Sequence, residues 1–422
     1  MSPTLTRPAT SRMRWTICAL LFFATTINYV DRSVLGLLAK TLQASIGFSD
    51  IDYGYINAAF QIAYGLAFLM AGRLIDAVGT RKGFSLAITV WSVAAMAHAA
   101  AFSAFTFGLA RVFLGFGEAA NFPACIKTVA EWFPKKERAF ATGIFNAGAN
   151  IGAVIAPLCV PWLAANWGWQ SAFIATGAIG FLWLVFWWMM YKTPQAHPGV
   201  SAAELELIES DPPDRPGHTP WKHLIGRRET WAFAAGKALT DPVWWFYLFW
   251  LPKYLQETFG LTLTQITLPM IVVFNASSVG SVFGGWLSST MLSRGVGVNR
   301  ARKTALLVCA VCVLPMLYAN YSKSLWVVVG LISLATAAHQ GWSANLFTLT
   351  SDLFPRSAVG SVVGIGGTAG AVGGAILQIS AGYIVQLTHS YLPLFLFGGS
   401  AYLVALAIIQ LLTPKLEPAQ VA

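Results

Sequence analysis

The sequence predicts an all-helical membrane protein with twelve transmembrane helices, arranged as two pseudo-symmetric halves of six. Three observations support this fold class. The chain has 422 residues, of which 56% are hydrophobic and only 10% are charged, whereas a soluble domain carries about 25% charged residues. Its apolar runs approach the roughly 20 residues that a bilayer-spanning helix needs. A long polar stretch divides these runs into six and six. The composition excludes a soluble enzyme, a disordered scaffold and a coiled coil.

The apolar runs follow one another with short loops. The first is too long for a signal peptide and lacks a small-residue cleavage site after it, so it remains a membrane helix. None shows the alternation of a membrane β-barrel strand. We expect spans at 14–38, 53–72, 83–102, 104–130, 138–163, 168–191, 230–257, 264–292, 303–320, 325–350, 357–386 and 391–412.

The polar stretch 192–229 is rich in Pro, Glu, Asp and Arg and is expected to be a linker. It divides the chain into an N-terminal six-helix half, 1–191, a cytoplasmic central linker, 192–229, and a C-terminal six-helix half, 230–422. The halves also repeat, since Glu-Trp-Phe-Pro at Glu131 returns as Asp-Leu-Phe-Pro at Asp352, 221 residues later. Such duplication is typical of secondary transporters.

Positive charges gather on alternate loops and account for most of the net charge of +10. This pattern predicts that both termini are cytoplasmic, and it explains the basic balance without nucleic acid. The cytoplasmic residues would be Arg7, Arg12, Arg14, Arg73, Arg81, Lys82, Lys135, Lys136, Arg138, Lys192, Arg215, Lys222, Arg227, Arg228, Arg294, Arg300, Arg302, Lys303, Arg356 and Lys415. The five cysteines lie in or beside apolar runs without paired metal spacing, so we expect no metal site.

The loop after the second span begins at Gly72 and continues through Asp76, Gly79, Arg81 and Lys82. It resembles the Gly-x-Leu-x-Asp-x-x-Gly-x-Arg-Lys signature of the major facilitator superfamily. We expect Gly72 to allow close helix approach, Asp76 to accept bonds from basic groups and Gly79 to suit a turn. These residues would hold one conformation closed at its cytoplasmic end.

Four charged residues lie inside the first and fourth spans: Asp31, Arg32, Arg111 and Glu118. Each charge costs about 3 kcal/mol at the centre of a membrane helix. Arg111 and Glu118 share one helix face, and Arg111 lies at a similar depth to Asp31, which predicts an Asp31–Arg111 ion pair. A purely structural network is the alternative, but four charges exceed what one structural pair needs and favour the lining of an aqueous cavity.

The C-terminal half carries fewer charges. Lys237 and Asp241 are spaced i,i+4 and can pair on one helix face. His339 is the repeat counterpart of Glu118, and Gln340 follows it, so two polar groups lie near the midplane. Whether His339 binds substrate or is a hydrogen-bonded packing residue stays open.

Further polar groups suit a ligand with many hydroxyls: Tyr64, Asn146 and Asn150, although each alone is typical of helix packing. The glycine-rich eleventh span is expected to be a close-packing and rocking surface. Lys127 and Lys253 lie near span ends, where we expect them to snorkel.

Several motifs resemble the anion:cation symporter family of the same superfamily. They begin at Tyr29, Arg111 and Glu131, and stretches beginning at Ile144, Lys237 and His339 are most similar to its hexuronate transporters. The resemblance implies that Arg32 binds the substrate carboxylate and that Tyr29 and Tyr64 contact the substrate. It implies that Asp31 and Glu118 carry protons, with Arg111 controlling Asp31.

The sequence therefore predicts a proton-coupled symporter that imports a sugar-acid anion, a hexuronate first, by alternating access. Fixed arginines can offset the substrate charge, and coupled protons favour entry against an inside-negative potential. The alternatives are an aldonate or aldarate symporter and a transport-like membrane sensor. A channel or a membrane enzyme is disfavoured, and we expect no cofactor beyond protons. We expect a monomer in the bacterial inner membrane, whose partners are the lipid bilayer and a small carboxylate.

Overall fold

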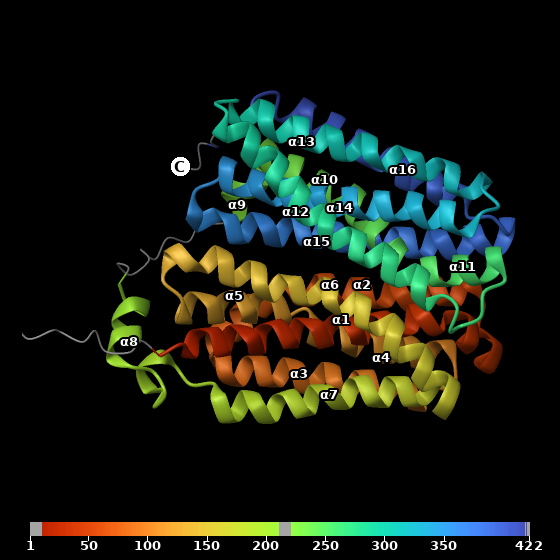
Figure 1. The fold of residues 1–422 in the computed structure, drawn as a ribbon, viewed down its shortest axis with the longest axis horizontal. Coiled ribbons are helices and arrows are strands. Elements are labelled where there is room, and N and C mark those ends of the chain that lie inside the picture. The colour runs from red at the N-terminus through yellow and green to blue at the C-terminus, as the bar shows by residue number, and fades with distance from the viewer. Residues whose placement is uncertain (1–10, 211–220, 418, 420–422) are drawn as a thin grey trace, which may run out of the picture.

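The structure is a computed structural model that describes residues 11–210, 221–417 and 419, and all regular secondary structure in these ranges is helical. Arg7 and Arg215 of the predicted charge pattern lie outside the described residues. The helices run roughly along one axis in two groups, one drawn in red to yellow and the other in green to blue (Figure 1).

The helix bounds follow the apolar runs closely. The first group comprises α1 (Met13–Ile46), α2 (Asp50–Val78), α3 (Thr80–Ala97), α4 (Ala104–Glu118), α5 (Asn121–Trp132), α6 (Lys135–Trp167) and α7 (Trp169–Met190). The second comprises α10 (Arg228–Phe249), α11 (Leu251–Phe259), α12 (Thr267–Ser293), α13 (Val298–Val313), α14 (Leu325–Leu353), α15 (Arg356–Thr388) and α16 (Leu392–Leu412). The polar stretch between the groups contains the short helices α8 (Ala202–Ile208) and α9 (Trp221–Ile225). The 3-10 helices are η1 (His98–Ala100), η2 (Pro194–Ala196) and η3 (Leu314–Tyr321).

Ten helices in the described part of the chain are long and apolar enough to cross a membrane. The two remaining expected spans are helices that break: α4 followed by α5, and α10 followed by α11. The second break lies at Trp250, where Pro252 in the first turn of α11 has no backbone N–H to donate. Each of the twelve expected spans therefore has a helical counterpart, and the two broken ones carry charged residues of the candidate site.

Glycines bring the broken helix α4 unusually close to its neighbours. A Cβ atom added to Gly115 would lie 2.7 Å from the carbonyl oxygen of Phe60 in α2, and one added to Gly117 would lie 2.6 Å from the backbone nitrogen of Trp91 in α3. A larger residue at either position would push the helices apart. The glycines thus determine how closely α4, and with it Glu118 at its last position, packs against α2 and α3.

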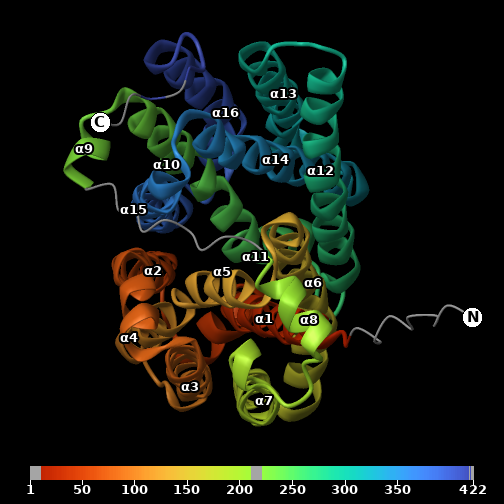
Figure 2. The same cartoon turned by 90° about the vertical axis from the view of Figure 1, so that its left-hand side faces the viewer.

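The two groups meet chiefly where α2 packs on α15 and α6 on α12 (Figure 2), and α1 also contacts α10 and α11. The glycine-rich face of α15 supplies the close approach that the sequence predicted. Within the second group, added Cβ atoms would lie 2.2 Å from the ring of Phe233 at Gly366 and 2.1 Å from the carbonyl oxygen of Ala238 at Gly373, both in α10. Gly65 of α2 in turn approaches Ala371. Close packing is confirmed, whereas rocking on this surface stays a prediction.

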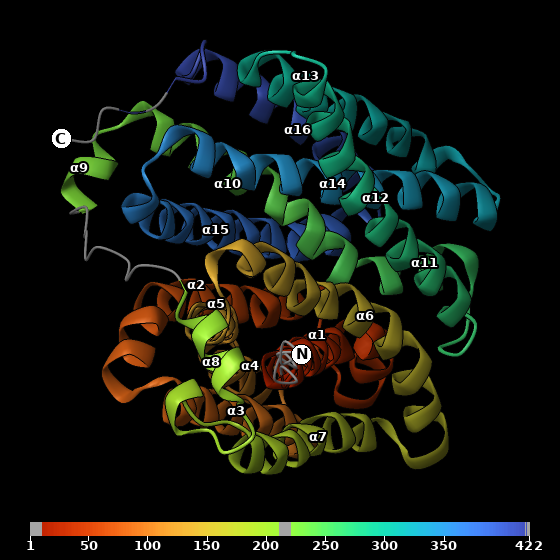
Figure 3. The same ribbon diagram turned by 60° about the vertical axis from the view of Figure 1, so that its left-hand side comes forward.

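One end of the molecule is fastened across the two groups; we call it the Asp50 end. Tyr53 donates a hydrogen bond of 2.6 Å to the carbonyl of Phe249, and the backbone N–H of Ile51 donates one of 3.0 Å to Gln386. Lys253 of α11 pairs with Asp50. Helices α8 and α9 lie at the opposite end, which we call the α8 end (Figure 1, Figure 3).

Candidate functional site

A buried ion pair between α1 and α4 forms the centre of the site. Glu118 accepts hydrogen bonds from Arg32 through a single oxygen, Oε2, at 2.8 Å from Nε and 2.7 Å from Nη2. The two side chains are 2% and 0% exposed. Arg32 also donates to Oδ1 of Asn28 at 3.2 Å, while Oε1 of Glu118 has no hydrogen-bond partner in the described part of the chain. An anion with two oxygens could therefore compete with Glu118 for the guanidinium.

Four aromatic rings surround the Arg32 guanidinium. Its central carbon lies 4.8 Å from the ring centre of Tyr29, 5.0 Å from Tyr64, 5.2 Å from Phe60 and 5.1 Å from Trp245. Ring faces stabilise a cation at these distances. Trp245 belongs to α10 and the other residues to α1 and α2, so the cation lies where the two helix groups meet.

Arg111 of α4 contacts the backbone of Arg32. It donates a long hydrogen bond of 3.4 Å to the carbonyl oxygen of Arg32, and its guanidinium lies over the rings of Phe60 and Phe249 at 5.3 Å and 5.4 Å. Its side chain is buried and its Nε has no partner. Arg111 thus adds positive charge beside Glu118 without a direct ion pair.

The expected Asp31–Arg111 ion pair is wrong. Both carboxylate oxygens of Asp31 are buried without a hydrogen-bond partner among the described residues, and α1 packs against α7 on one side. Neighbouring residues of an α-helix point about 100° apart, so Arg32 faces the second group while Asp31 faces α7. Equal depth in the membrane did not bring Asp31 and Arg111 together.

The expected pair in α10 is confirmed. Lys237 and Asp241 are 2.7 Å apart, and the Lys237 ammonium lies 4.6 Å from the ring centre of Phe347. The carboxylate of Asp241 also abuts Gly370, where a Cβ atom would lie 2.4 Å from Oδ2. The charge of the Lys237 ammonium is therefore already neutralised by Asp241 of the same helix.

His339 takes the packing role that the sequence left open. Its Nδ1 lies 2.6 Å from the hydroxyl of Tyr402, and its ring stacks on Trp244 at 5.3 Å. Gln340 is half-buried, and none of its side-chain atoms makes a hydrogen bond with a described residue. Asn146 is exposed and Asn150 half-buried, and neither side chain makes a hydrogen bond with a described residue.

The motif loop between α2 and α3 is partly as expected. Gly79 has φ of 86°, a conformation that suits glycine, and Asp76 accepts from Lys127 at 2.7 Å. Lys127 therefore pairs with an exposed carboxylate, and its expected snorkelling stays a prediction. Arg81 lies over the ring of Trp188 at 4.5 Å, whereas Lys82 is exposed. The expected close approach at Gly72 is wrong, because a Cβ atom there would meet nothing within 4 Å.

Sequence reasoning missed Asn28, Phe60, Gln61 and Trp245. Gln61 in α2 is fully buried, and neither its Oε1 nor its Nε2 has a hydrogen-bond partner within residues 11–210, 221–417 and 419. A polar residue inside an apolar span is a usable signal for Asn28 and Gln61. Phe60 and Trp245 gave no signal, because aromatic residues are frequent throughout the chain.

Comparison with known proteins places this arrangement in context. Residues 21–378 match the family model described as Major Facilitator Superfamily. The chain is 31% identical over 390 residues to the hexuronate transporter of Escherichia coli (strain K12), covering 91% of this chain and 90% of that protein. It is 28% identical to a probable galactarate/D-glucarate transporter of the same strain, covering 93% of each.

A solved structure shares the fold. It is a bacterial homologue of the human lysosomal transporter Spinster in an inward-facing and occupied conformation, with a TM-score of 0.73 and 19% identity. The alignment covers 96% of this chain and 98% of that one.

Proposed function

This chain belongs to the major facilitator superfamily of membrane transporters, and we propose that it imports a sugar-acid anion, a hexuronate first, together with protons. The observation that carries the proposal is the buried Arg32, held between two helix groups by one oxygen of Glu118. A planar guanidinium is suited to bidentate recognition of a carboxylate.

Competition for Arg32 provides the coupling. While Glu118 is ionised it occupies Nε and Nη2 of Arg32. A proton on Glu118 removes its negative charge, so the guanidinium becomes available to the substrate carboxylate. Substrate and proton therefore bind together, and both leave when the site opens to the other side. Asp31, buried without a hydrogen-bond partner among the described residues, is the second candidate proton carrier, and Arg111 adds the positive charge that favours ionised Glu118.

The surroundings of Arg32 suit a polyhydroxylated ring. Tyr29, Tyr64 and Trp245 offer ring faces to sugar C–H groups. Asn28 Nδ2 and the Gln61 amide are buried with unused hydrogen-bonding capacity, which substrate hydroxyls can fill. Asn146, Asn150, Lys237, Asp241 and Gln340 are more distant candidates, which would contact substrate only after the groups move.

We propose that helices α1–α7 and α10–α16 are the two moving halves, and that the α8 end faces the cytoplasm. The described basic residues of the predicted pattern lie in the loops and helix ends of that side, in agreement with the positive-inside rule. The Asp50 end would then be closed to the outside, and the site would be reached from within. A single chain contains both halves, which supports function as a monomer.

Uptake into proteoliposomes tests the function. Labelled galacturonate is followed with and without an inward proton gradient, and unlabelled glucuronate, galactonate and galactarate compete. We expect gradient-driven accumulation that a hexuronate inhibits best. Stronger inhibition by galactonate or galactarate would move the substrate to the aldonates or aldarates, and no accumulation of any of them would refute the proposal.

A further inference from the structure

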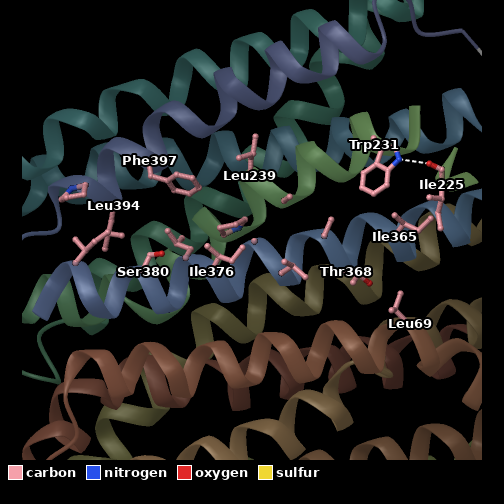
Figure 4. A pocket seen from close by; sticks show the side chains of 18 residues that line it. Leu69, Ile225, Trp231, Leu239, Ile365, Thr368, Ile376, Ser380, Leu394 and Phe397 are labelled. Atoms are coloured by element: carbon pink, nitrogen blue, oxygen red, sulfur yellow. Dashed lines mark hydrogen bonds between the residues drawn. The ribbon is translucent and has the colours of Figure 1, made fainter. Parts of the chain in front are cut away.

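The second helix group contains a long apolar groove outside the substrate site. The groove has a volume of about 720 Å³ and lies between α15 and α16, with α10 as its floor (Figure 4). Its lining includes Leu239, Ile365, Val372, Ile376 and Phe397, and is apolar apart from the hydroxyls of Thr368 and Ser380. Both Val372 and Ile376 are more than half exposed, so the groove opens to the membrane.

The groove breaks the pseudo-symmetry of the molecule. Helices α15 and α16 both pack on α10 but hardly touch each other. Their counterparts in the first group, α6 and α7, both pack on α1 and also contact each other. The space between α15 and α16 is open, whereas the equivalent space between α6 and α7 is filled by side chains. We expect a ligand to fill the open one, because an empty apolar hollow loses packing contacts.

The dimensions and the charges identify that occupant. Along α15 the groove runs from Ile365 to Ile384, about 28 Å at 1.5 Å per residue, so it crosses nearly the whole hydrocarbon core of about 30 Å. The acyl chains of a lipid from one leaflet would occupy the half nearest that leaflet. At its α8 end it reaches Ile225 and Trp231, which are joined by a hydrogen bond of 2.7 Å from the indole N–H to the carbonyl (Figure 4). A half-exposed tryptophan at this place is typical of the lipid headgroup level.

Two basic residues lie close in the sequence to Ile225 and Trp231, which line this end of the groove. Lys222 is in α9 and Arg227 directly precedes α10, and neither side chain makes a hydrogen bond or ion pair with a described residue. Arg228, in contrast, is paired with Glu229 at 3.4 Å. Basic pockets at the cytoplasmic side of membrane helices are suited to anionic lipid headgroups.

We propose that this groove binds one anionic phospholipid of the cytoplasmic leaflet. Its phosphate contacts Lys222 and Arg227, and its acyl chains lie over Trp231 and Ile365 toward Val372. The lipid would fill the space that side chains fill between α6 and α7. The site is separate from the Arg32 centre and does not depend on the transported substrate.

Native mass spectrometry of the full chain, delipidated and titrated with phosphatidylglycerol or phosphatidylcholine, tests the proposal. We expect one tight phosphatidylglycerol and weaker phosphatidylcholine binding. Lys222→Gln with Arg227→Gln should weaken phosphatidylglycerol binding about 30-fold, at about 1 kcal/mol for each basic residue. The matched control, Arg294→Gln with Arg300→Gln, removes two exposed charges elsewhere at the same side and should bind as the parent does.

A second pair of variants tests the groove itself. Ala369→Trp fills it and should also abolish tight binding, whereas Val282→Trp, on an exposed face of α12, should not. The proposal is overturned if the Lys222 and Arg227 variant binds phosphatidylglycerol as tightly as the parent, or if both lipids bind equally. It is also overturned if either control loses binding as its partner does. Since the proposal does not involve Arg32, failure here leaves the transport function standing.

Discussion

Arg32 is charged in a nearly water-free position because several groups replace its hydration. Glu118 and Asn28 accept its hydrogen bonds, and four aromatic rings cover its faces. The same enclosure makes Arg32 selective among anions, because an incoming anion must accept hydrogen bonds from Nε and Nη2, which Glu118 now occupies.

Substitution of Arg32 should remove the anion site. Arg32→Ala should abolish substrate binding and transport, and Arg32→Lys should restore little, because a point charge cannot reproduce two parallel hydrogen bonds. Calorimetry on purified protein measures the affinity, with an elution profile like that of the parent as the folding control. Unchanged affinity in the alanine variant would place the anion site elsewhere, with Lys237 as the next candidate.

Glu118→Gln should separate binding from coupling. Glutamine resembles the protonated acid, so Arg32 stays available to substrate and counterflow should continue. Accumulation driven by a pH gradient should be lost, because no proton can be released. Both activities are measured on one preparation. Normal accumulation would leave Asp31 as the principal proton carrier, while loss of both would indicate that Glu118 mainly holds α1 and α4 together.

Among the helices, part of the polar stretch 192–229 is held in place, because α8 is bonded to the start of α1. Glu204 of α8 is fully buried and accepts from the backbone N–H of Met13 at 3.1 Å and of Arg14 at 3.2 Å, at the start of α1. The Arg14 side chain adds an ion pair at 2.9 Å, and Ser11 a further hydrogen bond. Glu204 thus caps a helix that begins 191 residues earlier in the sequence.

The capping carboxylate predicts a pH-dependent attachment of α8. Burial opposes ionisation, but the hydrogen bonds from Ser11 and Arg14 outweigh it and hold the pKa of Glu204 below its usual value. Its stabilising contribution is therefore complete above about pH 4.3, the unfolded value, and is lost as the pH falls through the lower folded pKa.

Hydrogen exchange of α8 and of the first turn of α1 measures this attachment. Glu204→Gln should lower the local opening free energy by about 1 to 2 kcal/mol at pH 7. The difference from the parent should vanish in acid below the folded pKa. Glu206→Gln, an exposed neighbour in the same helix, is the matched control. Equal protection in both variants at pH 7 would contradict the capping role.

At the scale of the whole molecule, the Asp50 end holds the two groups together. Lys253 is 1% exposed and lies between Asp50 of α2 and Glu257 of its own helix, 3.3 Å away. Gln43 donates to Asp50 and Tyr391 to Glu257, each at 2.7 Å. The sequence suggested that Lys253 snorkels. Instead, its buried ammonium links the two groups through the ion pair with Asp50.

Loss of this lysine should open the Asp50 end. Lys253→Met leaves two carboxylates without their cation, which costs the closed state roughly 3 kcal/mol, or about 100-fold in population. Cysteines replacing Tyr55 and Tyr383, whose hydroxyls are 3.2 Å apart across the groups, report the change by cross-linking with a short reagent. We expect slower cross-linking than in the parent. The control is Lys323→Met, an exposed lysine, and a rate as fast as the parent's in Lys253→Met would contradict this role.

The sequence by itself determined the spans, the repeat and the local contacts. Apolar runs bounded by charge are local properties, and every helix from α1 to α16 that crosses the bundle follows one of them. The Lys237–Asp241 pair and the turn at Gly79 also depend only on nearby residues. Depth within the membrane could likewise be counted from the ends of each run.

Only the tertiary structure decided which side chains meet. It paired Arg32 with Glu118, left Asp31 facing α7, brought Trp245 over Arg32 and turned His339 toward Tyr402. The physical reason is that a membrane helix is apolar on its lipid face and on its packed face alike. The amphipathic pattern that orients a soluble helix is therefore weak, and the rotation of each helix is set by close contacts such as those at the glycines of α4 and α15.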